Sequence, residues 1–159
     1  MANEAMASSG AKIFIGPTTA ATTASAYAAL TWTEIKGSET IGEFGDAAGA
    51  ITFTGLGDAR VQKLKGAFDA GDITAVFARL PLDPGQIAAK VAAGTKLSYA
   101  IKVTVDDSAD ANDTDSVFYF HVKVMSAKNG IGGANDVLKF TLNLAITTGI
   151  IEVASVAVS

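Results

Sequence analysis

Strict alternation of apolar and polar residues is the feature that most limits how this chain can fold. The clearest run places an apolar residue at every second position: Leu138, Phe140, Leu142, Leu144 and Ile146. Residues 97–105 and 118–124 repeat the pattern. Since successive side chains of a β-strand point to opposite faces, the three runs predict strands that bury one face and expose the other. Such one-sided strands are typical of antiparallel sheets.

Shorter apolar runs predict five further strands, over residues 12–15, 30–36, 51–54, 73–80 and 150–158. The segments 73–80 and 150–158 have no clean polar face. We therefore expect both of these strands to be covered on two sides, with another subunit as one of the covers.

A single segment, about 83–94, predicts a helix. Asp83 is a suitable N-cap, Pro84 suits the first helical position, Gln86 completes a capping box and Gly94 ends the helix. The stripe expected to pack on the sheet has four members: Ile87, Ala88, Val91 and Ala92. The predicted fold is mainly β, an antiparallel β-barrel or β-sandwich with one flanking helix. A length of 159 residues fits a single domain, 1–159, with a flexible N-terminus at 1–10.

Three segments show no regular pattern: 18–29, 44–71 and 106–115. The second is long for a connection in a compact domain, and connections of that length are usually functional or disordered. The third holds five aspartates: Asp106, Asp107, Asp110, Asp113 and Asp115. A calcium loop begun at Asp110 would need glycine at its sixth position and glutamate at its twelfth, where this chain has Asp115 and His121. A solvated hairpin loop is the better interpretation, and a calcium site is the alternative.

The sequence offers few parts for catalysis, and we expect no catalytic residue, cofactor or metal site. There is no cysteine, so thiolate chemistry and disulfides are excluded. The one histidine, His121, shares a strand face with Tyr119 and Lys123, where we expect it to be exposed or at an interface. The glycine pairs at 55–57 and 130–133 do not continue into a phosphate-binding motif.

Charge and hydropathy exclude two further classes of protein. The net charge is −4, and the cations are ten lysines and only two arginines, which disfavours sequence-specific binding of nucleic acid. No apolar run reaches the roughly 18 residues that cross a bilayer. The first ten residues are polar and include Glu4, so neither a membrane partner nor a signal peptide is expected.

The order of several short runs resembles the major tail tube proteins of long-tailed bacteriophages. The runs are WTEI at 32–35 with Gly37 and GE at 42–43, ITFT at 51–54, KLKGAFDAGD at 63–72, DPGQ at 83–86 and GANDV at 133–137. The resemblance spans about residues 12–153, and its weight lies in the order of the runs.

This resemblance implies a structural protein of the virion tail, assembled in the host bacterial cytoplasm. Six copies would close into a ring, rings would stack into a tube, and DNA would pass through without specific binding. Other implied partners are a tape-measure protein, a tail terminator and baseplate or tip proteins. Segment 44–71 would be the loop that reaches the adjacent ring, with six charged residues as candidate inter-ring contacts: Asp58, Arg60, Lys63, Lys65, Asp69 and Asp72.

Two alternatives stay open. The tube protein of a secretion or contractile injection system would have the same fold and ring symmetry. A monomeric β-sandwich that binds calcium through residues 106–115 would belong to a different class.

A tube that conducts DNA is expected to offer acids and small polar groups to its channel, because like charge repels phosphate.

Overall fold

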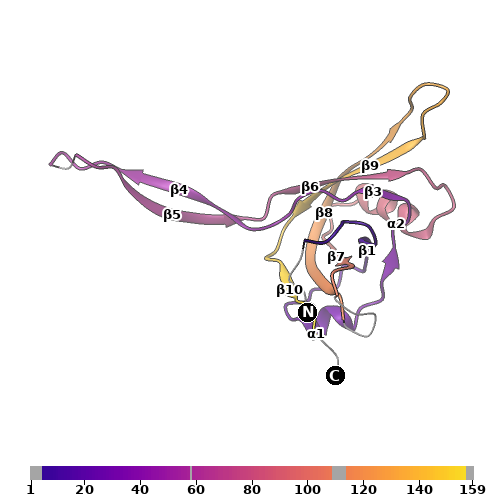
Figure 1. Cartoon of the computed structure of the whole chain (residues 1–159), viewed down its shortest axis with the longest axis horizontal. Coiled ribbons are helices and arrows are strands. Elements are labelled where there is room, and N and C mark those ends of the chain that lie inside the picture. The colour runs from indigo at the N-terminus through magenta and orange to yellow at the C-terminus, as the bar shows by residue number, and fades with distance from the viewer. Residues whose placement is uncertain (1–4, 58, 109–113, 157–159) are drawn as a thin grey trace.

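One curled antiparallel sheet forms the body of the protein in the computed structural model, which describes residues 5–57, 59–108 and 114–156 (Figure 1). The strand order is β2-β1-β7-β8-β9-β6-β3, and β10 pairs with β8. The strands are β1 Lys12–Ile15, β2 Thr33–Glu34, β3 Ser38–Thr40, β6 Asp72–Ala78, β7 Tyr99–Val105, β8 Ser116–Gly130, β9 Lys139–Ile146 and β10 Ile151–Val153. The predicted class, mainly β with one flanking helix, is confirmed in the form of a half-barrel.

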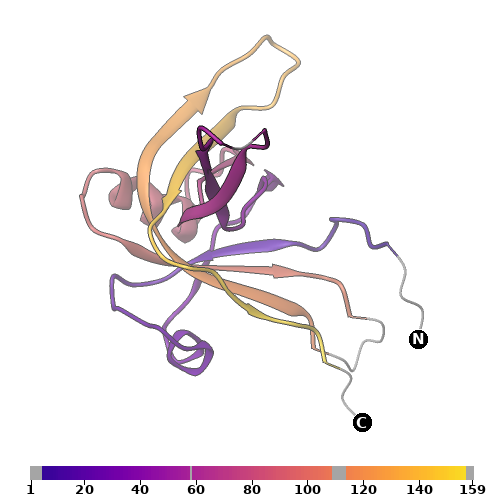
Figure 2. The same cartoon turned by 90° about the vertical axis from the view of Figure 1, so that its left-hand side faces the viewer.

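The half-barrel follows from the connectivity of its two edge strands. β2 and β3 lie at opposite ends of the strand order, yet only residues 35–37 separate them in the chain. The sheet must therefore curl until its two ends lie close together, as Figure 2 shows. Its concave side holds the core.

The core consists of the side chains that the alternation assigned to the inner faces. In β9, Phe140, Leu142 and Leu144 are fully buried and the residues between them are only half-buried. In β6, Ile73 and Phe77 are buried in the same way. Within one chain only one face of β6 is buried, so the second cover expected for residues 73–80, another subunit, stays a prediction.

The main helix, α2 (Pro84–Ala93), is fastened to the sheet by hydrogen bonds at its first turn. Asp83 Oδ2 accepts from the backbone N–H groups of Gln86, at 3.0 Å, and Lys36, at 3.1 Å. The side chain of Gln86 donates to the carbonyls of Lys36 and Ala78, both at 2.8 Å, and accepts from Leu80 N at 3.0 Å. These bonds join the helix to the segment between β2 and β3 and to the end of β6.

The predicted helix is confirmed, but its predicted buried stripe is partly wrong. The buried residues of α2 are Gly85, Gln86, Ala89 and Ala92. Ile87 and Val91 are 48% and 63% exposed. The hydrogen bonds of Asp83 and Gln86 fix the rotation of the helix and turn its smallest residues toward the sheet.

A second, short helix was not predicted, and it changes the environment of the histidine. α1 (Ala24–Ala28) lies in the segment expected to be irregular. Its Tyr27 stacks on Tyr119 at 5.2 Å between ring centroids, and its hydroxyl lies 2.7 Å from His121 Nδ1. His121 Nε2 lies 2.8 Å from the Thr19 carbonyl, which only accepts, so Nε2 donates to it, and in the neutral ring Nδ1 accepts from the Tyr27 hydroxyl. His121 is buried, and the expectation of an exposed or interface histidine is wrong because residues 18–29 fold over that face of the sheet.

Segment 44–71 is also more regular than predicted. It contains a two-stranded hairpin of β4 (Ala47–Phe53) and β5 (Gln62–Asp69), of which only residues 51–54 were predicted as strand. The C-terminal strand is shorter than predicted: β10 covers Ile151–Val153, Val156 forms an isolated bridge with Thr114, and residues 157–158 lie outside the described part of the chain. Among the described residues, no helix is long and apolar enough to span a membrane.

Replacing Gly85 by alanine is expected to lower the free energy of unfolding by about 1–3 kcal/mol, because a Cβ at this position would overlap the carbonyl oxygen of Glu34. Urea unfolding followed by circular dichroism measures the change. Gly94→Ala is the matched control, since its nearest neighbour would be the Val91 carbonyl oxygen at 3.4 Å and its φ is −84°. Equal stability of the two variants would contradict the close packing of α2 on β2.

Candidate functional site

The feature that sets this protein apart from a closed barrel is an arm, which we define as the hairpin of β4 and β5 with its tip at residues 54–61. The arm projects far from the half-barrel (Figure 1), and β5 alone, with eight residues at about 3.3 Å each, spans roughly 26 Å. It leaves the body between β3 and β6, so it continues the end of the sheet beyond the core.

The two faces of the arm differ in chemistry. Ile51 pairs directly with Leu64, and Phe53 lies two residues along on the same face opposite Gln62, so this face is mostly apolar. Thr52 pairs with Lys63, and Lys65 lies on that same opposite face. The arm thus has an apolar face and a lysine face.

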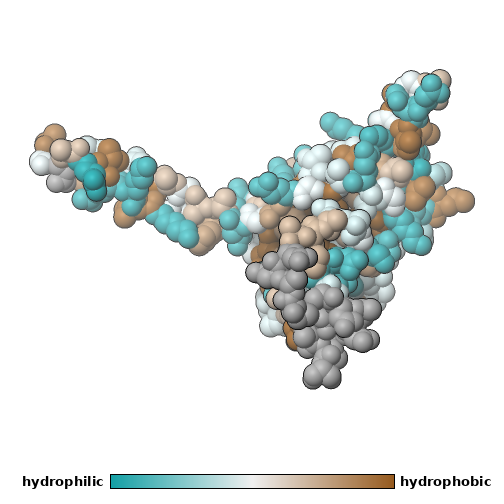
Figure 3. Space-filling model, viewed as in Figure 1, coloured by the Kyte–Doolittle hydropathy of each residue, from teal (hydrophilic) through white to brown (hydrophobic). Residues whose placement is uncertain are grey.

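No other part of the described chain covers the apolar face. Ile51, Phe53 and Leu64 are 52%, 58% and 60% exposed, and Leu56 at the tip is fully exposed. Figure 3 shows apolar and polar residues interspersed along the arm. A two-stranded hairpin is marginally stable alone in water, and several large apolar side chains exposed on one such hairpin favour a contact surface. The arm has the features of an interaction surface.

The six charged residues predicted for inter-ring contact occupy different places on this arm. Lys63 and Lys65 lie on its lysine face, where Lys65 Nζ is 4.7 Å from the ring centroid of Phe68, and Arg60 lies at the tip. Asp69 ends β5 and accepts from Gly71 N at 2.9 Å, so it shapes the turn at the root of the arm.

The two remaining residues of that set give no support for a contact through the arm. Asp72 begins β6 and pairs with Ala145 in the body of the sheet, so it is not on the arm. Asp58 lies outside the described residues. The structure thus brings together the three cations of the set and separates Asp69 and Asp72 from them.

The acidic segment 106–115 joins β7 to β8, and three of its five aspartates are described. Asp107 accepts from Ser116 N at 2.8 Å and from Ser116 Oγ at 2.6 Å, and Asp115 accepts from Ser108 N at 3.2 Å. The two hydrogen bonds from Ser116 lower the pKa of Asp107. Asp110 and Asp113 lie outside the described residues. Among the described residues, no three acidic or histidine side chains gather as a metal site would need.

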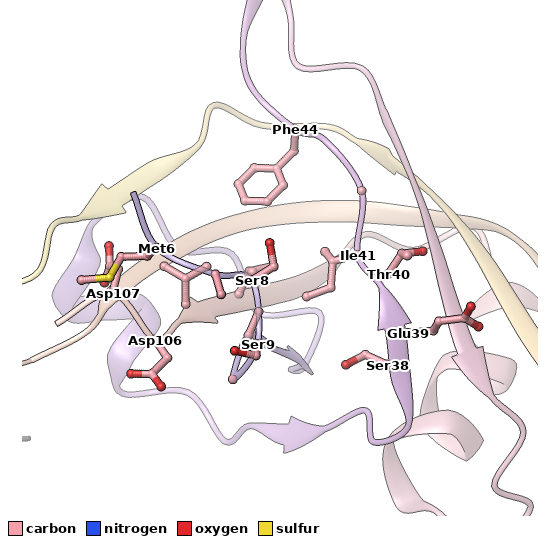
Figure 4. Close-up of a pocket in the computed structure, with 16 residues that line it drawn as sticks. Met6, Ser8, Ser9, Ser38, Glu39, Thr40, Ile41, Phe44, Asp106 and Asp107 are labelled. Carbon is pink, nitrogen blue, oxygen red and sulfur yellow. The ribbon is translucent and has the colours of Figure 1, made fainter. Parts of the chain in front are cut away.

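A groove opens near the root of the arm, with a cavity volume of about 630 Å³ (Figure 4). Three segments distant in sequence form it: residues 6–11 before β1, residues 38–44 around β3, and residues 103–107 at the end of β7. Phe44 forms part of its wall and packs against Phe118 and Phe120 at 5.1 and 5.5 Å between ring centroids. Sequence reasoning missed this groove because no single segment carries its pattern.

Comparison with solved structures identifies the fold. A chain of the cryo-EM structure of the anti-feeding prophage (AFP) baseplate, 6-fold symmetrised, matches with a TM-score of 0.72 and 11% identity over 97% of this chain and 98% of that one. A chain of the PVC sheath/tube terminator of an extracellular contractile injection system, in the extended state, matches with a TM-score of 0.70 and 11% identity over 97% and 100%. The SPP1 tail tube matches with a TM-score of 0.62 and 14% identity over 89% and 75%.

The protein therefore has the fold shared by a phage tail tube protein and by components of contractile injection systems. At the level of the fold, this confirms the resemblance to tail tube proteins drawn from the order of the sequence runs. No family model matches the sequence. No curated protein sequence matches it either.

Replacing Ser116 by alanine is expected to raise the pKa of Asp107 toward its ordinary value, because the hydroxyl that stabilises the carboxylate is lost. Since the depressed pKa stabilises the fold above the unfolded-state value, the variant should lose more stability near neutral pH than below the folded-state pKa. A loss independent of pH remains, because Ser116 Oγ also accepts from Ser155 N at 3.0 Å. Carboxyl-carbon NMR titration measures the shift. An unchanged Asp107 titration would show that the hydroxyl does not hold this carboxylate.

Proposed function

We propose that this protein is a structural subunit of a tail tube, in which six copies close into a ring, rings stack, and the arm contacts the adjacent ring. The observation that carries the proposal is the arm itself: a half-barrel of the tail-tube fold extends a hairpin whose apolar face has no cover in the described chain. A second copy is the simplest molecule to supply that cover.

The edges of the half-barrel support self-assembly. β3 pairs with β6 on one side and ends the strand order, and no strand pairs with its other side in the part of the chain that the structure describes. An unpaired edge strand is a template for pairing with another chain. Contacts between different surfaces of identical chains close into rings or continue as filaments, which are the two geometries that a stacked tube combines.

The proposed role is structural and not catalytic, in the tail of a virion assembled in the host bacterial cytoplasm. DNA would pass through the ring without specific binding, which agrees with a net charge of −4 and two arginines. The further partners proposed are a tape-measure protein, a tail terminator and baseplate or tip proteins. The tube of a contractile injection system is the nearest alternative, because one of the similar structures is the sheath/tube terminator of such a system.

Negative-stain electron microscopy of the purified, concentrated protein is expected to show rings or tubes with a central channel and six-fold end views. Light scattering coupled to gel filtration measures the mass of the smallest assembly. A species that remains monomeric across concentration and salt would contradict the proposal. Rings of another symmetry would contradict only the number of copies.

Reversing the charge of the lysine face, Lys63→Glu with Lys65→Glu, is expected to reduce tube length and yield, because the cations would no longer meet acids on the next ring. The matched control is Lys90→Glu with Lys96→Glu, an equal charge change at exposed positions on α2 and just beyond it. Both double variants should keep the wild-type circular dichroism spectrum. Unchanged tubes in the arm variant would exclude the lysine face from inter-ring contact.

A further inference from the structure

We infer that the groove beside β3 is the receptor for the arm of a second copy, so that the arm tip of one subunit seats in the seam of another. The inference rests on the proposed function and specifies which surface the arm contacts.

The seam that holds the groove lies along β3, where the strand order of the sheet ends. On one side is β3, whose three residues are all exposed and whose free edge carries backbone groups able to pair with an added strand. On the other side are residues 6–11 and the end of β7. A strand of another molecule fits such a position because it can bond to the free edge and fill the gap at once.

Apolar side chains in the groove match those of the arm. Ile41, Phe44 and Val103 line the cavity, and Ile41 and Phe44 pack against the buried core. Leu56 is fully exposed at the end of the arm, where it can enter a cavity of about 630 Å³ as an anchor.

The charges of the two surfaces are opposite. Glu39, Asp106 and Asp107 line the groove. Arg60, Lys63 and Lys65 lie at the tip and along the lysine face of the arm. Lys139 offsets the charge of Glu39 at 2.9 Å, whereas the hydrogen bonds from Ser116 leave the negative charge of Asp107 in place. With Asp106 and Asp107, the lining of the groove remains acidic. Complementary charge on the two surfaces fixes the partner and the register of docking.

The chain's own arm points away from its own groove. Figure 1 shows the arm extending from the body on the side opposite α2, and Figure 2 shows the arm end-on. Phe44, at the root of the arm, forms part of the groove wall, so the arm starts at the seam and leaves it. The occupant that fits is therefore the arm of a second copy.

Cysteine cross-linking tests this inference cleanly, because the chain has no cysteine. Leu56→Cys protein is mixed with affinity-tagged Ser38→Cys protein, assembled and mildly oxidised. The expected result is a disulfide between positions 56 and 38 of different copies, identified by mass spectrometry, in several-fold higher yield than for Leu56→Cys mixed with Lys96→Cys. A yield no higher than this control would overturn the inference.

The doubly substituted chain, Leu56→Cys with Ser38→Cys, distinguishes copies from self-contact. Linked multimers are expected, whereas a monomeric internal disulfide would show that the groove receives its own arm and would overturn the inference. Rings without the 56–38 link would overturn this inference alone. Absence of both rings and link would overturn the proposed function as well.

A charge exchange tests the charge match, with the yield of the 56–38 disulfide as the readout. Asp106→Lys in the groove partner is expected to lower the 56–38 yield several-fold, and Lys63→Asp in the arm partner is expected to restore it. Glu152→Lys, at an exposed site on β10, is the matched control and should leave the yield unchanged. Equal losses for Asp106→Lys and Glu152→Lys would contradict the charge match. Thermal unfolding monitors whether each variant folds.

Discussion

The positions of α2, of the β2–β3 connection and of the end of β6 depend on the buried hydrogen bonds of Asp83 and Gln86. Gln86 uses both donors of its amide and its carbonyl oxygen, so its burial leaves no polar atom unpaired. Its partners, Lys36, Ala78 and Leu80, flank the two strands that end the sheet on that side, β3 and β6. Together with the cap at Asp83, these bonds hold α2, the β2–β3 connection and the end of β6 in one place. The position of β3, and with it one wall of the groove, follows from this contact.

The arm is the part of the hairpin strands that extends beyond the hydrophobic core. β6 belongs to the core, but the strands that precede it in the chain, β4 and β5, extend past the last buried layer. Each of Ile51, Phe53 and Leu64 would contribute about 1.5–3 kcal/mol if fully buried, and none does so in the isolated chain. That unused free energy is available to association, against the entropy that association costs. Folding and assembly thus draw on different surfaces of the same chain.

The sequence predicts those parts of the structure in which a local pattern and the burial agree. Alternation in β9 and the capping residues of α2 are such cases, and both elements are present. Of the arm's two strands only residues 51–54 are predicted from the sequence, because both faces of the hairpin are exposed and residues 47–50 are alanines and a glycine, which carry no alternation. α1 is only five residues long, too short for a helical period to be visible. The rotation of α2 and the burial of His121 depend on side chains distant in sequence, which no local pattern records.

Although the net charge is −4, cations and acids are concentrated on different surfaces, the arm and the groove. A contact between copies that pairs these charges would join the arm of one copy to the groove of another. The described residues of the arm's tip and lysine face carry Arg60, Lys63 and Lys65, while acids line the groove, and lysines also lie on the outer face of β8. Because arm and groove are different surfaces, a contact between them is heterologous: each copy uses its arm on one neighbour and its groove on another. A self-complementary patch would stop at a dimer. An arm-to-groove contact leaves one free arm and one free groove after every addition, which is the property that a stack of rings requires to continue.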